Sequence, residues 1–89
     1  MKEAKYEEDR KMADSEGLNR TTIHIAGNDY TIVGTESPEH VREVGLLVDT
    51  KIREIREQAP QLDVRQIAVL AALNIGSDYV KIKKNLGEL

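Results

Sequence analysis

The stretch from residue 62 to residue 89 most constrains the fold, because it combines a well-marked helix start with two separate apolar faces. Its sequence is LDVRQIAVLAALNIGSDYVKIKKNLGEL. Asp63 can accept hydrogen bonds from the free N–H groups of a first helical turn, and Gln66 can return the bond to the Asp63 backbone, which forms a capping box. Leu62 and Ile67 have the spacing of a hydrophobic staple around this cap. We therefore predict a long helix over residues 63–89.

The apolar residues of this predicted helix change pattern along its length. Residues 67–73 (IAVLAAL) are apolar on all sides, which is typical of a buried helix, and the run is far shorter than the ~20 residues that cross a bilayer. A stripe with alternating steps of four and three residues, the spacing of a coiled-coil seam, then continues to the end. The seam residues are Ala68, Ala72, Ile75, Tyr79, Ile82, Leu86 and Leu89. Val69, Leu73 and Val80 form a second stripe about 120° round the helix.

These two faces predict that the helix packs on its own domain with one side and on the same helix of a second copy with the seam. The alternative is a single helix pair within one chain.

Asn74 interrupts the apolar run, and a buried amide must find partners. It either fixes the register of the helix pairing or reaches the rim and meets water, and both interpretations stay open. A glycine such as Gly76 lowers the stability of a helix by about 1 kcal/mol relative to alanine. Close approach of another backbone would explain why glycine stands there, and the alternative is that it stands there by chance.

The composition of the chain also favours self-association. The chain has 89 residues and neither Trp nor Phe, so it forms one domain with a light core, which rarely supplies more than ~3–5 kcal/mol by itself. Oligomerisation is a usual remedy. The absence of cysteine excludes disulfides and thiolate metal sites and permits a reducing cytoplasm. The net charge of −3 argues against a nucleic-acid partner, and neither end has the apolar region of a signal peptide.

The N-terminal half is expected to hold a charged tail and a hairpin. Residues 1–19 have too few apolar side chains to bury, so a flexible tail is predicted, with a short frayed helix over residues 3–12 as the alternative. Met12 is one candidate for the natural start. Residues 20–34 contain two β-rich runs, 21–25 and 30–33, around AGND, in which Gly27 and Asn28 tolerate the positive φ of a tight turn. Alternation places Ile23 and Ile25 on one face and Thr22 and His24 on the other.

A second helix is predicted over residues 38–59, between the hairpin and the long helix. Ser37 is a good N-cap, and Pro38 suits the first helical position. An apolar stripe follows at steps of three and four residues, and it comprises Val41, Val44, Val48, Ile52, Ile55 and Ala59. Pro60 ends the helix, and the link to residue 63 is so short that the two helices should be antiparallel neighbours. The predicted class is α+β: an N-terminal β-hairpin followed by two antiparallel α-helices, the second of which forms an intermolecular coiled coil.

No pattern predicts chemistry. His24 and His40 are isolated, and the sequence has no nucleophile motif, no phosphate-binding loop and no zinc spacing. We therefore predict no catalytic residue, no metal, no cofactor and no enzyme activity.

Three segments in order resemble the ZapA family of bacterial cell-division proteins, which associate with the tubulin-like GTPase FtsZ. They are the hairpin TTIHIAGNDYTIVG, the helix EHVREVGLLVDTKIREI and the run LDVRQIAVLAALNIGSDY, and the match covers residues 20–89. The resemblance implies a cytoplasmic, non-enzymatic protein at the mid-cell division ring. It implies a dimer whose second helices can join two dimers into a tetramer. It also implies that the protein bundles FtsZ protofilaments and lowers GTP turnover, without binding nucleic acid or membrane.

Two sets of site residues follow. The self-association interface is predicted to comprise Ala68, Ala72, Asn74, Ile75, Tyr79, Ile82, Leu86 and Leu89. The FtsZ contact is predicted to be charged and near the link between the helices, at Arg53, Arg56, Glu57, Asp63 and Arg65. The hairpin near His24 and Asn28, or the lysines Lys81, Lys83 and Lys84, are the alternative contacts. The alternative function is a generic homodimerisation or adaptor module in a regulatory complex.

Overall fold

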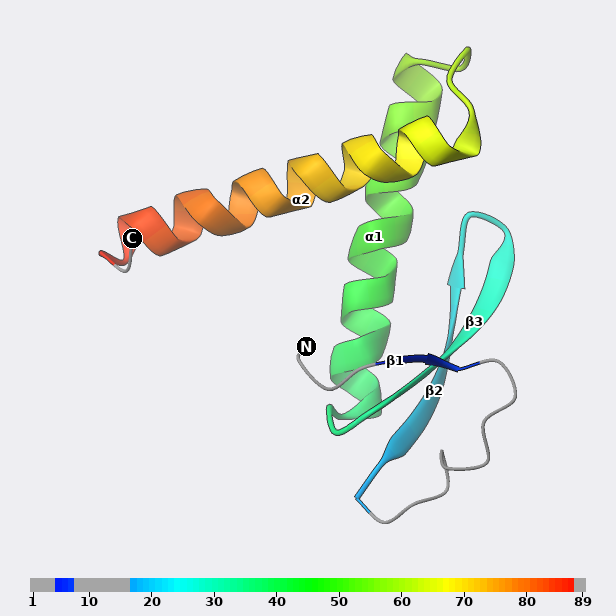
Figure 1. The fold of residues 1–89 in the computed structure, drawn as a ribbon, viewed down its shortest axis with the longest axis vertical. Coiled ribbons are helices and arrows are strands. Elements are labelled where there is room, and N and C mark those ends of the chain that lie inside the picture. Colours follow the sequence, from blue (N-terminus) through cyan, green and yellow to red (C-terminus); the bar gives the residue numbers. More distant parts are fainter. Residues whose placement is uncertain (1–4, 8–16, 88–89) are drawn as a thin grey trace. The chain divides into compact units, whose positions relative to one another are not determined.

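The fold of the computed structural model, described for residues 5–7 and 17–87, is a small antiparallel sheet followed by two helices (Figure 1). The elements in order are β1 (Lys5–Glu7), β2 (Asn19–Ile25), β3 (Asn28–Gly34), α1 (Pro38–Gln58) and α2 (Val64–Asn85). The hairpin followed by two helices confirms the predicted α+β class. The chain divides into two compact units, residues 1–49 and residues 50–89, so α1 contributes to both.

The hairpin of the first unit pairs β2 with β3 over seven residues, from Asn19↔Gly34 to Ile25↔Asn28. A two-residue turn joins the strands, and both of its residues have positive φ: Ala26 at 54° and Gly27 at 83°. Positive φ at both central residues is the mark of a type I′ turn, whose twist matches that of the flanking strands. Of the two residues noted for their tolerance of positive φ, Gly27 adopts it, whereas Asn28 lies in β3 and pairs with Ile25, and Ala26 takes the other left-handed position.

A third strand, β1, lies within the stretch that was predicted to be a flexible tail. It pairs antiparallel with β3, from Lys5↔Val33 to Glu7↔Thr31, which gives the sheet the order β1-β3-β2. For these three residues, and for Asn19 in β2, the tail prediction is wrong. Backbone groups on an open strand edge can pair with any extended segment, whatever its side chains. The composition of the tail therefore could not predict this strand. Residues 1–4 and 8–16, which contain most of the predicted tail and most of the alternative helix, lie outside the described residues.

The interior of the first unit is lined by one face of the hairpin and the start of α1. Thr21, Val33 and Val41 are buried, Ile23 and Ile25 are half-buried, and Thr22 and His24 are exposed, which confirms the predicted alternation. Gly45 of α1 lies against β2. A Cβ on Gly45 would be 3.1 Å from the Cβ and Cγ2 atoms of Ile23, closer than ordinary carbon contacts. Glycine at this position therefore lets the helix backbone approach the sheet.

Both helices begin at the predicted caps. The backbone N–H of His40 donates to Ser37 Oγ at 3.1 Å at the start of α1. At the start of α2, Gln66 N donates to Asp63 Oδ1 at 2.8 Å, and Asp63 N donates to Gln66 Oε1 at 3.0 Å, which completes the capping box. α1 ends at Gln58, one residue before the predicted end. α2 ends at Asn85, four residues before the predicted end, since Gly87 has φ of 77° and leaves the helix.

The second unit buries little of α2. Ile52 and Ile55 of α1 are buried, as are Ile67 and Ala71 of α2, and Lys51 Nζ lies 3.8 Å from Asp78 Oδ2. The prediction that residues 67–73 are buried all round is wrong for the single chain, because Val69 is 59% exposed and Leu73 is 63% exposed. One partner helix can cover only one side of α2, and the remaining apolar side chains stay in water.

Candidate interaction surfaces

The predicted seam lies mostly on the uncovered side of α2. Tyr79 is 60% exposed, Ile82 is 57% exposed and Leu86 is 68% exposed, and the small residues Ala68 and Ala72 are exposed as well. Ile75 is half-buried within its own chain, and Leu89 lies outside the described residues. Contiguous exposed apolar side chains on a soluble protein mark a surface that another molecule covers. The described seam is thus available for pairing, with Ile75 already shared with the chain's own packing.

Lys83 lies close to Tyr79 of the seam. Its Nζ atom lies 3.3 Å from the Tyr79 hydroxyl and 5.2 Å from the centre of the ring. The two residues are four positions apart, about one helical turn, so their side chains lie on the same face of α2. An exposed cation–π contact contributes about 0.5–1 kcal/mol, so the lysine orients the tyrosine without preventing another helix from covering it.

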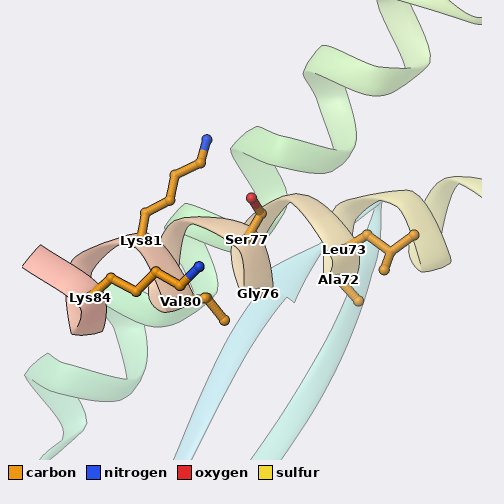
Figure 2. A pocket seen from close by; sticks show the side chains of 7 residues that line it. All are labelled: Ala72, Leu73, Gly76, Ser77, Val80, Lys81 and Lys84. Carbon is orange, nitrogen blue, oxygen red and sulfur yellow. The ribbon is translucent and has the colours of Figure 1, made fainter. Parts of the chain in front are cut away.

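A shallow groove runs over the second stripe of α2 (Figure 2). It has a volume of about 550 Å³, and its lining residues are Ala72, Leu73, Gly76, Ser77, Val80, Lys81 and Lys84. Figure 2 shows Leu73 and Val80 on either side of Gly76, with the stem of Lys84 reaching toward Val80 and Lys81 extending in another direction. The groove exists because glycine leaves a gap between two apolar side chains.

The two residues that sequence analysis left ambiguous are both open to solvent in the single chain. Asn74 is exposed. A Cβ on Gly76 would meet no atom within 4 Å, so nothing in its own chain requires glycine there. The roles of Asn74 and Gly76 in an interface therefore stay predictions.

The predicted partner-binding residues lie in the second unit, in two groups. Arg53, Arg56 and Glu57 are exposed, and their spacing puts them on one face of the end of α1. Arg53 Nη2 donates to Thr50 Oγ1 at 3.4 Å. Asp63 and Arg65 are exposed at the start of α2, where the Asp63 carboxylate is used by the capping box. Within the part of the chain that the structure describes, no hydrogen bond or ion pair joins Arg65 to the α1 group.

The histidines do not form a site. His24 Nδ1 lies 2.7 Å from Asp29 Oδ1 on the exposed face of the hairpin, while His40 is exposed at the start of α1. Among the described residues, no group of three or more His, Cys, Asp or Glu side chains could hold a metal ion. Over those same residues, no helix has the length and apolar character needed to span a membrane.

Two exposed apolar residues on α1 were missed by sequence analysis. Leu46 is 64% exposed and Leu47 is 50% exposed. The signal was present, because neither leucine belongs to the apolar stripe that starts at Val41. Large apolar residues outside a helix's own stripe indicate a second surface.

Comparison with known proteins gives a consistent result. The family model described as "Cell division protein ZapA" matches residues 21–89. A protein of that name from Geobacillus sp. (strain WCH70) is 51% identical over 70 residues, which cover 79% of this chain and 80% of the relative. The one from Bacillus subtilis (strain 168) is 47% identical over 70 residues, covering 79% and 82% of the two chains. A solved structure, "ZapA mutant dimer from Geobacillus stearothermophilus", has a TM-score of 0.68 and 44% identity, and the match covers 83% of this chain and 86% of that one.

Proposed function

Because the chain belongs to the ZapA family of cell division proteins, we propose that it is a cytoplasmic, non-enzymatic protein that binds FtsZ and bundles its protofilaments. In this role it supports assembly of the division ring at mid-cell and lowers the GTPase activity of FtsZ. It needs no cofactor, and its partners are FtsZ and further copies of itself.

The observation that carries the proposal is the exposed apolar seam of α2. Tyr79, Ile82 and Leu86 are each more than half exposed, and a second α2 helix covers them in the proposed homodimer. The similar solved structure from Geobacillus stearothermophilus is a mutant dimer, which supports self-association. A tetramer of two dimers is the alternative assembly, and a generic adaptor module is the alternative function.

Self-association also explains how a small protein cross-links filaments. A closed two-fold dimer presents each surface twice, so two equivalent contacts can engage two protofilaments. The proposed contact comprises Arg53, Arg56, Glu57, Asp63 and Arg65, which are exposed while the apolar faces are used in packing. Arginine suits docking on an acidic partner because its guanidinium offers five donors in a fixed fork.

Co-sedimentation of polymerised FtsZ tests the proposal. The wild-type protein should pellet with the polymer and increase the pelleted FtsZ, and it should hydrolyse no GTP by itself. The triple variant Arg53→Ala, Arg56→Ala and Arg65→Ala should stay dimeric and folded but pellet less. Raised salt should mimic it, because exposed charges are screened beyond ~8–10 Å at near-physiological ionic strength.

A charge-matched control separates this surface from a general charge effect. The triple variant Lys81→Ala, Lys83→Ala and Lys84→Ala changes the net charge equally at the other end of α2 and should pellet as the parent does. Equal loss in both variants would indicate non-specific attraction. Loss only in the lysine variant would move the contact to the end of α2. An intact dimer that never pellets with FtsZ would favour the adaptor function.

A further inference from the structure

Among the described residues, no strand pairs with the outer edge of β2. In the sheet order β1-β3-β2, β2 is an edge strand, and its register with β3 runs through seven consecutive pairs without a bulge. Its sequence, NRTTIHI, contains neither proline nor lysine. Soluble proteins usually protect such edges with prolines, lysines, bulges or very short strands, because an unprotected edge is a template for another strand.

The turn geometry identifies which backbone groups face outward. A two-residue turn makes Ile25↔Asn28 a hydrogen-bonded pair, and pairs then alternate along an antiparallel ladder. Thr22↔Thr31 and His24↔Asp29 are therefore non-hydrogen-bonded pairs. The close side chains of such pairs agree with this, since the two threonine Oγ1 atoms lie 3.3 Å apart and the His24–Asp29 contact is 2.7 Å. The N–H and C=O groups of Thr22 and His24 point away from β3, toward the open edge.

A groove accompanies this edge within the first unit. It has a volume of about 210 Å³ and is lined by Thr22, Ile23, His24, Arg42, Gly45 and Leu46. Leu46 is 64% exposed, and the close approach at Gly45 forms the floor beside Ile23. Arg42 is exposed and makes no ion pair with any described residue, and no carboxylate lines the groove. An incoming strand thus meets an apolar surface and one cation on the α1 side.

We propose that the open edge of β2 and this groove together dock an extended, acidic peptide segment of a partner protein, which adds to the sheet as a further antiparallel or parallel strand. Main-chain hydrogen bonds to Thr22 and His24 supply affinity, and alternate side chains supply specificity. Alternate residues of the added strand face α1, where an apolar side chain contacts Leu46 and a carboxylate interacts with Arg42. The residues between them face away from α1 and lie beside Thr22. This site uses residues of the first unit only, whereas the FtsZ contact proposed above uses residues 53–65 of the second unit, and the present proposal does not depend on that contact.

The test is a fluorescence anisotropy titration of the whole protein against defined probes. The first probe is a terminally blocked, labelled peptide, long enough to span β2, in which every second residue is Val or Glu in turn and the residues between them are Thr, so that one face offers both Val and Glu. The second replaces Glu by Lys, and the third carries N-methyl groups on alternate backbone nitrogens of the Glu/Val peptide. Because the protein has a net charge of −3, non-specific attraction favours the lysine peptide. We expect the Glu/Val peptide to bind at least about tenfold more tightly than either of the others.

Variants locate the binding. Thr22→Pro removes an outward N–H without breaking the ladder to β3, since proline is tolerated on an edge strand. Thr22→Val is its matched control and also lacks the hydroxyl. Thr22→Pro should weaken binding by about two- to tenfold for the hydrogen bond alone, whereas Thr22→Val should bind as the parent does. Arg42→Glu should weaken binding further, and Arg53→Glu, in the other unit, should leave it unchanged.

Three results would overturn the proposal. The first is no binding of the Glu/Val peptide, or equal binding of its N-methylated form. The second is equal binding of the Glu/Val peptide to Thr22→Pro. The third is a lower molecular mass of Thr22→Pro than of Thr22→Val by light scattering, because the edge would then pair with a second copy of this chain.

Discussion

Asp49 of α1 holds the turn of the hairpin: its Oδ1 atom accepts a hydrogen bond from the backbone N–H of Ala26 at 2.9 Å. The contact joins a helix to a turn 23 residues earlier in the chain. Both residues are half-buried, so water competes only partly for the bond. The left-handed conformation at Ala26 is thus maintained by a side chain from another element.

Replacing Asp49 by Ala is expected to lower the free energy of unfolding by about 1.5–3 kcal/mol, the range for hydrogen bonds to charged groups. Asp49→Asn keeps an acceptor oxygen and should lose clearly less. Chemical denaturation followed by circular dichroism measures both. Equal losses in the two variants would show that the bond to Ala26 is not what Asp49 contributes.

Ala26→Asn is expected to stabilise the protein by about 1 kcal/mol. Ala26 has φ of 54°, a conformation that costs an L-residue roughly 1–2 kcal/mol and that asparagine adopts more readily. Ala26→Val is the opposing control, because a branched side chain is disfavoured there, and it should destabilise. A melting temperature that is the same for all three proteins would contradict the turn geometry.

Thr21→Val is expected to raise the free energy of unfolding by about 1 kcal/mol. Thr21 is 3% exposed, and its hydroxyl oxygen has no hydrogen-bond partner among the described residues. Valine has nearly the same shape and removes the cost of the unpaired group. The control is Thr22→Val on the exposed face, which should change stability little. Destabilisation by Thr21→Val would reveal a partner for the hydroxyl.

Gly45→Ala is expected to have two opposing effects on the free energy of unfolding. Alanine in a helix interior raises it by about 1 kcal/mol relative to glycine, but the new Cβ would overpack against Ile23, which lowers it by about 1–3 kcal/mol. We expect a net loss near 1 kcal/mol. In an Ile23→Ala background Cγ2 and Cδ1 are gone and only the Cβ contact at 3.1 Å remains, so the same change should cost less. Additive effects in this double-mutant cycle would place the strain elsewhere.

Ile82→Glu is expected to convert the proposed dimer into a folded monomer. Ile82 is 57% exposed in the single chain, so the charge costs little there, but it costs several kcal/mol in a packed helix interface. It is a cleaner probe than Ile75, which is half-buried within its own chain. Asn85→Glu adds the same charge off the seam and should leave the mass unchanged by light scattering. An unchanged mass for Ile82→Glu would show that the seam is misassigned.

Local signals in the sequence predicted the elements well. The caps at Ser37 and Asp63 and the alternation of Ile23 and Ile25 are set by neighbours within a few residues, so a pattern can identify them. The strand β1 forms by pairing with β3, which is distant in the sequence. Glycine is needed at position 45 because Ile23 lies against it, and no local pattern includes both residues. The turn conformation at Ala26 was missed for the same reason, since Asp49 lies 23 residues away.

The candidate surfaces were predicted only in part. The seam was predicted from its spacing and stays a prediction, since the structure shows only that most of its described residues are exposed. The burial of residues 67–73 was overestimated because one chain cannot enclose its own helix. Leu46 and Arg42 become candidates for binding only in the fold, where α1 lies beside the edge of β2. Charged residues such as Arg53 and Arg65 are exposed in the structure, yet exposure is common to most charged side chains and does not select a contact.

The uncovered apolar side of α2 has a consequence for how the cell controls this protein. If the dimer proposed above forms, its stability depends on the concentration of the chain, because association stabilises the folded state by mass action. Tyr79, Ile82 and Leu86 are exposed in a single chain and become covered only on pairing. In that case the rate of synthesis would set both the amount of the protein and the fraction of it that is assembled, so a modest fall in expression would remove more dimer than polypeptide.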